Sequence, residues 1–286
     1  MAGPITRIVD AHIHFWDPAR ADWYPYLAGA MTLDIGDITG MIRPFHPATY
    51  RAESAAWPVD KVIHVSAAGG FIADETAERE VMGAETGDPA AIIGGILSGV
   101  TPAENIALID AQMAASRFRG VRTMGADPGG VPHPDVLRAL QERNLVFDLM
   151  VHPDLLEPAA RTLADHGDLT VVVEHTGWPR TNDPDEYARW KTGMTALAAL
   201  DHVQCKLSGL TMPFATMDPE VFRPWIEFAL DRFGVDRCFF ASNFPVDSSH
   251  GTFDELYTTF DALTADLSDA DRDRLFATNA ERVYRC

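Results

Sequence analysis

Short apolar runs recur along the chain, and each is followed by a turn and then by a longer amphipathic stretch. The length of these runs and their enrichment in Val, Ile and Phe are typical of β-strands. An alternation of strand and helix predicts parallel strands joined by right-handed crossovers. Eight runs fit the pattern: residues 8–14, 62–66, 92–98, 120–124, 145–152, 170–175, 203–208 and 238–243.

The stretches between the runs begin with residues that favour helix N-termini. Thr101 is followed by a proline and, three residues on, by Glu104, which is the pattern of a capping box. Asp183 begins a second copy of this pattern, and Asp218 precedes a proline in the same way. Eight strand–helix units predict a single-domain (β/α)8 barrel, a TIM barrel, over residues 1–286, with a doubly wound sheet as the alternative.

The segment between the first and second runs is longer than the other connections and is rich in aromatic residues and prolines. On the active face of a barrel, a long aromatic loop is often a lid or a pocket wall. An insertion that only packs on the barrel rim fits the sequence equally well. The residues concerned are Trp16, Pro18, Trp23, Tyr24, Pro25, Tyr26, Pro44 and Pro47.

Alternation of side chains along a strand sorts each run into a face toward the helices and a face toward the barrel interior. On the first run Val9, Ala11 and Ile13 are predicted to face the helices, which places Asp10, His12 and His14 inside. The sixth and eighth runs each have one shared face, formed by Val171, Val173 and His175 and by Phe239, Ala241 and Asn243. The other runs add inward polar residues: His64, Ser66, Arg122, Asp148, His152, Gln204, Lys206 and Ser208.

These polar groups are predicted to converge near the carboxyl ends of the strands, where barrel enzymes place their chemistry. An inward lysine such as Lys206 must find an anionic partner, either a structural carboxylate or a substrate. Arg122 likewise requires either a structural carboxylate or an anionic substrate as its partner. A single inward histidine such as His64 is more often a hydrogen-bonded core residue than a ligand.

Charge and composition narrow the classes of partner. The chain has 42 acidic and 23 basic residues, a formal net charge of −19, which disfavours nucleic acid and anionic membranes as partners. Its central uncharged run is too short to span a bilayer, and the first residues lack the pattern of a secretory signal, so we expect a cytoplasmic protein. We expect a small-molecule substrate, and the apolar surface of barrel helices permits a homodimer.

Four motifs resemble those of the amidohydrolase superfamily: DAHIHFWD at 10–17, EHTGWP at 174–179, KLSGL at 206–210 and SNFP at 242–245. The terminal NAERVY at 279–284 is also similar to the family. The resemblance is to the TIM-barrel branch that includes 2-pyrone-4,6-dicarboxylate lactonase, 4-sulfomuconolactonase and sugar-acid lactonases. It implies a hydrolase whose pocket holds His12, His14 and His175, either as ligands of a divalent metal, Zn²⁺ above all, or without a metal, since both kinds occur in that branch.

One position departs from the family pattern. Where the family's last-strand motif usually has an aspartate, this chain has Asn243, and an amide neither takes a proton near neutral pH nor supplies negative charge. Three other ways to activate water remain open. Asp247 could reach back from the following loop, His152 could act as base, or a metal on His12, His14 and His175 could do so.

The sequence therefore predicts hydrolysis of a lactone or a related ester-like carbonyl in a small, carboxylated substrate. Arg122 and Lys206 would hold the carboxylate and offset charge on oxygen, Asn243 would orient water or substrate, and further contacts are expected from Ser66, His64 and Trp16. Metal-dependent decarboxylation or amide hydrolysis is the alternative within the superfamily. A third hypothesis is a barrel that has lost catalysis at Asn243 and only binds a ligand.

Overall fold

The structure is a computed structural model that describes residues 3–29, 38–69, 72–124 and 130–286. All eight predicted strands are present and form one parallel sheet in chain order, which confirms the (β/α)8 barrel. The strands are β1 (Ile8–Ile13), β2 (Val59–Val65), β3 (Ala91–Leu97), β4 (Phe118–Met124), β5 (Val146–Leu149), β6 (Val171–Val173), β7 (Val203–Leu207) and β8 (Cys238–Phe240).

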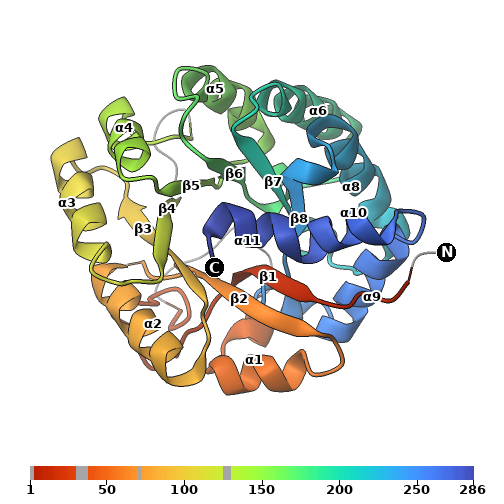
Figure 1. Ribbon diagram of the computed structural model, residues 1–286, viewed down its shortest axis with the longest axis horizontal. Helices are drawn as coiled ribbons and strands as arrows, with labels where there is room; N and C mark the ends of the chain where they lie inside the picture. The colour runs from red at the N-terminus through yellow and green to blue at the C-terminus, as the bar shows by residue number, and fades with distance from the viewer. Residues whose placement is uncertain (1–2, 30–37, 70–71, 125–129) are drawn as a thin grey trace.

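A ring of helices surrounds the strands (Figure 1). In the described part of the chain no helix is long and apolar enough to cross a membrane. The helices are α1 (Pro47–Glu53), α2 (Ile72–Thr86), α3 (Pro102–Gln112), α4 (Pro134–Glu142), α5 (Pro153–Leu163), α6 (Pro184–Ala198), α7 (Thr211–Phe214), α8 (Pro219–Phe233), α9 (Phe253–Leu263), α10 (Asp269–Asp273) and α11 (Asn279–Tyr284).

Local sequence explains where several helices begin. Thr101 and Glu104 form the predicted capping box at the start of α3, and the Asp218 side chain caps α8. Asp183 caps α6 as expected, but Glu186 accepts hydrogen bonds from the preceding loop and does not complete a second capping box.

The barrel closes between β1 and the segment that follows β8. The backbone N–H of His14 donates to the Phe244 carbonyl, and the N–H of Asn243 donates to the His12 carbonyl, both at 2.8 Å. Closure therefore occurs at the carboxyl ends of the strands and joins the first and last sequence motifs directly.

The side-chain phase of β1 differs from the prediction. Val9 and Ala11 belong to an apolar cluster that six strands contribute to the barrel interior, whereas Asp10 accepts a hydrogen bond from Tyr50 of the outer helix α1. The placement of Val9, Ala11 and Asp10 predicted from alternation is therefore wrong. A register shift in the pairing with β2 lies between Asp10 and Ile13, and within it His12 points inward after all.

The predicted inward orientation of two side chains on β2 is also wrong. Ile63 and Val65 belong to the interior cluster, and His64 and Ser66 face the opposite way, toward helix α2. Both make hydrogen bonds to Glu75 of that helix, which is itself buried. The sequence could not show this because every residue of this run, polar or apolar, is buried.

The aromatic loop after β1 packs on the barrel rim. Trp16, Trp23, Tyr24 and Tyr26 are all buried, and the Tyr26 hydroxyl donates to the Ala67 carbonyl at the end of β2. Residues 30–37 of this loop lie outside the described residues, so its role as a lid stays a prediction.

The C-terminal helix α11 crosses the end of the barrel that lies opposite the closure (Figure 1). Its last residue, Tyr284, belongs to the interior cluster and packs edge-on against Phe239. Its hydroxyl donates a hydrogen bond to Asp148 at 3.0 Å, deep inside the barrel. The end of the chain is thus part of the barrel core.

Candidate active site

Three histidines meet at the carboxyl ends of the strands. The Nε2 atoms of His12 and His14, from the end of β1, lie 3.2 Å apart, and the His12 ring centroid is 4.5 Å from that of His175. All three side chains are almost completely buried. The His14 Nδ1 lies 2.7 Å from the Val65 carbonyl, so Nδ1 carries the proton and Nε2 is left to face His12.

His175 reaches this position by a turn and not by strand alternation. Val171 and Val173 face the helices, while Val172 and then Glu174 point inward. The predicted shared face of Val171, Val173 and His175 is therefore wrong. The chain turns into the left-handed region at His175, with φ of 53°, and this swings the imidazole back into the barrel mouth.

Gly209 makes room for that imidazole. Its φ is +69°, and a Cβ at this position would lie only 2.6 Å from the His175 Nδ1. The preceding Ser208 hydroxyl lies 3.1 Å from the same nitrogen and orients the ring. A side chain at this position of the KLSGL motif would therefore clash with His175, which explains the glycine and which the sequence alone did not reveal.

The histidines are neutral at physiological pH. Burial is the main cause that lowers the pKa of His12 and His14 well below the ordinary value, and Lys206 and Arg122 add to it. Burial likewise lowers the pKa of His175 to about 3. Neutral imidazole is the form that binds a metal ion or donates a hydrogen bond to a carbonyl oxygen.

Glu174 is a site residue that the sequence analysis did not single out. Its Oε1 lies 3.4 Å from the His12 Nδ1 and 3.8 Å from the Lys206 Nζ, yet accepts no hydrogen bond from the described residues. Its Oε2 accepts one from Arg122. Burial alone would raise the pKa of Glu174, but Arg122 and Lys206 outweigh it and lower that pKa below its usual value. The place of Glu174 next to His175 in the EHTGWP motif was the available signal.

Lys206 has a structural anionic partner. Its Nζ donates to Asp148 at 2.6 Å and lies 3.3 Å from the His12 Nδ1, with both charged side chains fully buried. Burial raises the pKa of Asp148 above its usual value, whereas the Lys206 cation lowers it. The first of the two alternatives for Lys206, an ion pair within the protein, is what the structure contains.

Arg122 is anchored on two sides. Its Nε donates to the Ser66 carbonyl at 2.8 Å, and its Nη1 lies 3.2 Å from the Glu174 Oε2. Ser66 therefore supports the site through its backbone, while its hydroxyl donates to Glu75. Arg122 points inward as the sequence analysis predicts.

Asn243 and Asp247 form a buried pair in the segment after β8, whose Asn243 N–H donates to the His12 carbonyl. The Asn243 Nδ2 donates to the Asp247 Oδ1 at 2.8 Å, and Asn243 adopts a left-handed φ of 57°. Burial raises the pKa of Asp247 to about 7, although the hydrogen bond from Asn243 lowers it. The loop after β8 thus carries a carboxyl group that changes protonation near neutral pH.

Two further predicted residues lie at the edge of the histidine cluster. The half-buried His152 occupies the N-cap position of α5 without a side-chain capping bond, and its ring centroid lies 4.4 Å from that of Trp178. The Trp178 ring lies between His152 and His175, 5.9 Å from the latter. Trp16 stacks on His14 at 5.7 Å and donates its ring N–H to a loop carbonyl.

The residues present suit a divalent cation. Donor atoms of His12, Glu174 and His175 lie within 4.8 Å of one another. The 3.2 Å between the Nε2 atoms of His12 and His14 matches two bonds of about 2.0–2.1 Å to one ion at an angle near tetrahedral. A neutral imidazole set and a buried carboxylate oxygen without a hydrogen-bond donor are what such an ion requires.

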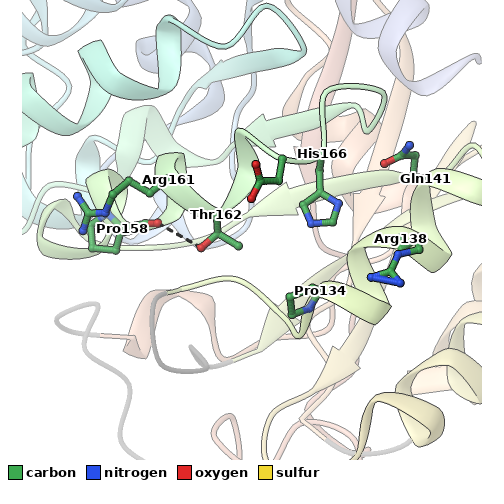
Figure 2. Close-up of a pocket in the computed structure, with 8 residues that line it drawn as sticks. Pro134, Arg138, Gln141, Pro158, Arg161, Thr162 and His166 are labelled. Carbon is green, nitrogen blue, oxygen red and sulfur yellow. Dashed lines mark hydrogen bonds between the residues drawn. The ribbon is translucent and has the colours of Figure 1, made fainter.

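A separate groove lies between α4 and α5, on the outside of the barrel (Figure 2). Its volume is about 880 Å³, and its two arginines, Arg138 and Arg161, are paired with acidic residues of their own helices. The groove shares no residue with the histidine cluster. Its lining residues are Pro134, Arg138, Gln141, Pro158, Arg161, Thr162, Asp165 and His166.

A closed eight-stranded barrel with a buried polar site at the carboxyl ends of its strands defines a barrel enzyme. The model of the amidohydrolase family matches residues 9–286, and the chain belongs to that family. It is a hydrolase, as the sequence analysis predicts.

Several relatives span nearly the whole chain. An uncharacterized protein of Sinorhizobium fredii, y4mH, is 30% identical and covers 97% of this chain and 98% of its own length. A Burkholderia multivorans protein named L-fucono-1,5-lactonase is 28% identical, covering 96% of this chain and 95% of its own.

Solved structures agree with these relatives. The crystal structure of a Burkholderia multivorans amidohydrolase with bound zinc is similar with a TM-score of 0.82 and 28% identity, covering 97% of this chain and 99% of that one. A second crystal form of that amidohydrolase, with bound HEPES, has a TM-score of 0.83 and 29% identity at the same coverage.

Proposed function

We propose that this hydrolase opens the ring of a small lactone by attack of water on its carbonyl carbon, at the site formed by His12, His14 and His175. The observation that carries the proposal is the meeting of three neutral histidines, two of which, His12 and His175, lie next to the buried carboxylate of Glu174. The name of the 28%-identical Burkholderia relative, L-fucono-1,5-lactonase, supports a sugar-acid lactone as the substrate class.

The histidine cluster would hold a divalent ion through His12, His14 and His175, with Glu174 as a fourth donor. Such an ion, when bound, polarises a carbonyl oxygen and offsets its developing negative charge. Zinc is the expected metal because imidazole nitrogen and carboxylate oxygen suit it, and because the similar Burkholderia amidohydrolase was crystallised with zinc.

Asp247 is the group that moves the proton. It is buried, its pKa of about 7 lets it both accept and return a proton near neutral pH, and its bond to Asn243 fixes its orientation. As the water oxygen adds to the carbonyl carbon, Asp247 takes the proton. It returns the proton to the ring oxygen when the ester bond breaks, and the product is a hydroxy acid.

Two buried cations would stabilise the anionic transition state. Arg122 and Lys206 flank Glu174 and lie in a site from which bulk water is largely excluded, so their charges act strongly on oxygen. A carboxylate on the substrate would meet Arg122, whose anchoring to the Ser66 carbonyl and to Glu174 keeps its orientation fixed.

The test measures ring opening of a panel of sugar-acid lactones, muconolactones and pyrones by metal-free and zinc-loaded protein. The proton released on hydrolysis serves as the readout. Asp247→Asn should lower kcat by about 10²–10⁴-fold. The matched control is Asp135→Asn, an exposed carboxylate at the start of α4. Absence of turnover with every lactone in both metal states would overturn the proposal. Carbon dioxide release from aromatic acids would instead support the decarboxylase alternative.

A further inference from the structure

Glu75 of helix α2 is a buried carboxylate that lies against the end of β2, behind the candidate active site. Glu75 is 1% exposed and lies outside all four sequence motifs. It is separated from the histidine cluster by the ends of β1 and β2, so it touches neither the proposed metal ligands nor Asp247. Its hydrogen bonds nevertheless converge on the two strand ends that hold the site.

The carboxylate gathers donors from the end of β2. Its Oε2 accepts from the Ser66 hydroxyl at 2.7 Å and from the Ala68 N–H at 3.1 Å, and its Oε1 lies 3.5 Å from the Ala67 nitrogen. A carboxylate has enough lone pairs for all of these bonds, whereas an amide side chain does not. Glu75 therefore determines the path of residues 66–68.

The same carboxylate also holds the end of β1. The His64 Nε2 lies 3.1 Å from the Glu75 Oε1, and its Nδ1 accepts from the Phe15 N–H at 3.1 Å. The pKa of His64 is lowered, chiefly by burial, so the ring is neutral and bridges the two groups with one donor and one acceptor nitrogen. Phe15 directly follows His14 in the chain.

The end of β2 presents two carbonyl groups to the site. The Val65 carbonyl accepts from the His14 Nδ1 at 2.7 Å, and the Ser66 carbonyl accepts from the Arg122 Nε at 2.8 Å. Outer hydrogen bonds of this kind select the tautomer and orientation of a functional imidazole. The peptide groups that make them are the ones that Glu75 fixes from behind.

We infer that Glu75 is the positioning residue of this site: it fixes the ends of β1 and β2 so that His14 presents its Nε2 to His12 and Arg122 presents its guanidinium to Glu174. Burial alone would raise the pKa of Glu75, but His64, Arg79 and Ser66 outweigh it and lower that pKa to about 2. The carboxylate therefore stays ionised at neutral pH, and both of its oxygens remain hydrogen-bond acceptors.

The inference rests on the site assignment made above and not on the identity of the lactone, so its test uses a readout besides turnover. Two-bond ¹H–¹⁵N NMR spectra report the tautomer of each histidine ring, and His14→Gln assigns the His14 signals. Wild-type protein should show His14 protonated at Nδ1 alone. In Glu75→Gln, that pattern should give way to a mixture of tautomers, and kcat/KM should fall by about 10- to 100-fold.

The matched control is Glu80→Gln. Glu80 lies on the same helix and also accepts bonds from a serine hydroxyl and a backbone N–H, those of Ser116 and Arg117, but far from the histidines. It should lower the melting temperature while leaving the His14 spectrum and kcat/KM unchanged. If Glu75→Gln does not fold, Ser66→Ala removes one of the bonds and should change both readouts in the same direction by less.

A normal His14 spectrum together with normal activity per folded molecule in Glu75→Gln, or in Ser66→Ala if that is the variant that folds, would overturn the inference and leave Glu75 a stabilising residue only. If wild-type protein opens no lactone, the proposed function fails, and the NMR comparison still decides the role of Glu75. A change in the spectrum in both Glu75→Gln and Glu80→Gln would also contradict the inference, because general loosening of α2 would then explain it.

Discussion

At the scale of single residues, the question raised by Asn243 is whether the site still has a carboxyl group that can act in catalysis. The chain places Asp247 four residues on, with its Oδ1 2.8 Å from the Asn243 Nδ2. The Asn243 amide therefore donates a hydrogen bond to a nearby carboxyl group, so a carboxyl group is still present in this segment. This geometry favours a rearranged catalytic pair over the ligand-binding barrel considered from sequence.

We expect Asn243→Asp to lower activity. Two carboxyl groups would face each other at that short distance, and like charges so close cannot both be ionised. At pH 7, kcat/KM should fall by about 10²-fold, since proton transfer by Asp247 would be disturbed. Steady-state kinetics beside the surface variant Asn182→Asp would test this. A gain of activity would show that the asparagine marks lost function.

We also expect Lys206→Met to destabilise the protein by about 3–5 kcal/mol, because it leaves the buried Asp148 carboxylate without its cation. Urea unfolding measures the loss. In the double variant Asp148→Asn, Lys206→Met the loss should be smaller than the sum of the two single losses. Strictly additive losses would mean that the two side chains do not act as an ion pair.

At the scale of elements, the eight strands and most helix starts follow from local patterns, but the facing of side chains on β1, β2 and β6 does not. Alternation along β1 predicted that its histidines point inward. The first residues of β1 face the opposite way from that prediction, and His12 points inward only because a register shift follows Asp10. On β6 the left-handed turn at His175 has the same effect. Bulges and turns depend on neighbouring strands, so a single run of residues does not reveal them.

The last helix, α11, places the Tyr284 hydroxyl inside the barrel, so we predict that this hydroxyl contributes to stability. Tyr284→Phe should cost about 1–3 kcal/mol, since Asp148 would lose a buried donor. Tyr257→Phe is the matched control, because the equally buried Tyr257 hydroxyl has no partner among the residues described. Chemical unfolding should find the control neutral or stabilised. Equal losses in both variants would mean that the bond to Asp148 contributes nothing.

At the scale of the whole molecule, buried carboxyl groups shape the pH dependence of stability. Asp247 keeps its proton up to about pH 7 in the folded protein, while its ordinary pKa is 3.8. Between these values the folded state binds a proton that the unfolded state has released, so this group's contribution to stability falls as pH rises. The fall amounts to about 1.4 kcal/mol for each unit of difference between the two pKa values.

Asp247→Asn should remove that slope. Relative to wild type, the variant should gain free energy of unfolding between pH 4 and pH 8, which urea titrations at several pH values would measure. Glu75 contributes in the opposite sense, since its lowered pKa adds stability above its ordinary value of 4.5 that disappears as pH falls toward 2. A difference between variant and wild type that is the same at every pH would contradict the assignment for Asp247.

Sequence by itself determined the barrel, and it predicted that His12, His14, His175, Arg122 and Lys206 meet at the carboxyl ends of the strands, where the structure places them. It could do so because strand length, helix caps and short motifs are local properties. Only the tertiary structure decided that Lys206 pairs with Asp148, that Glu174 joins the histidines, and that His64 turns away toward Glu75. Those outcomes depend on which buried polar groups come into contact from strands far apart in the chain. Because burying a charge without a partner is costly, each of these buried charged side chains is paired with a group from another element.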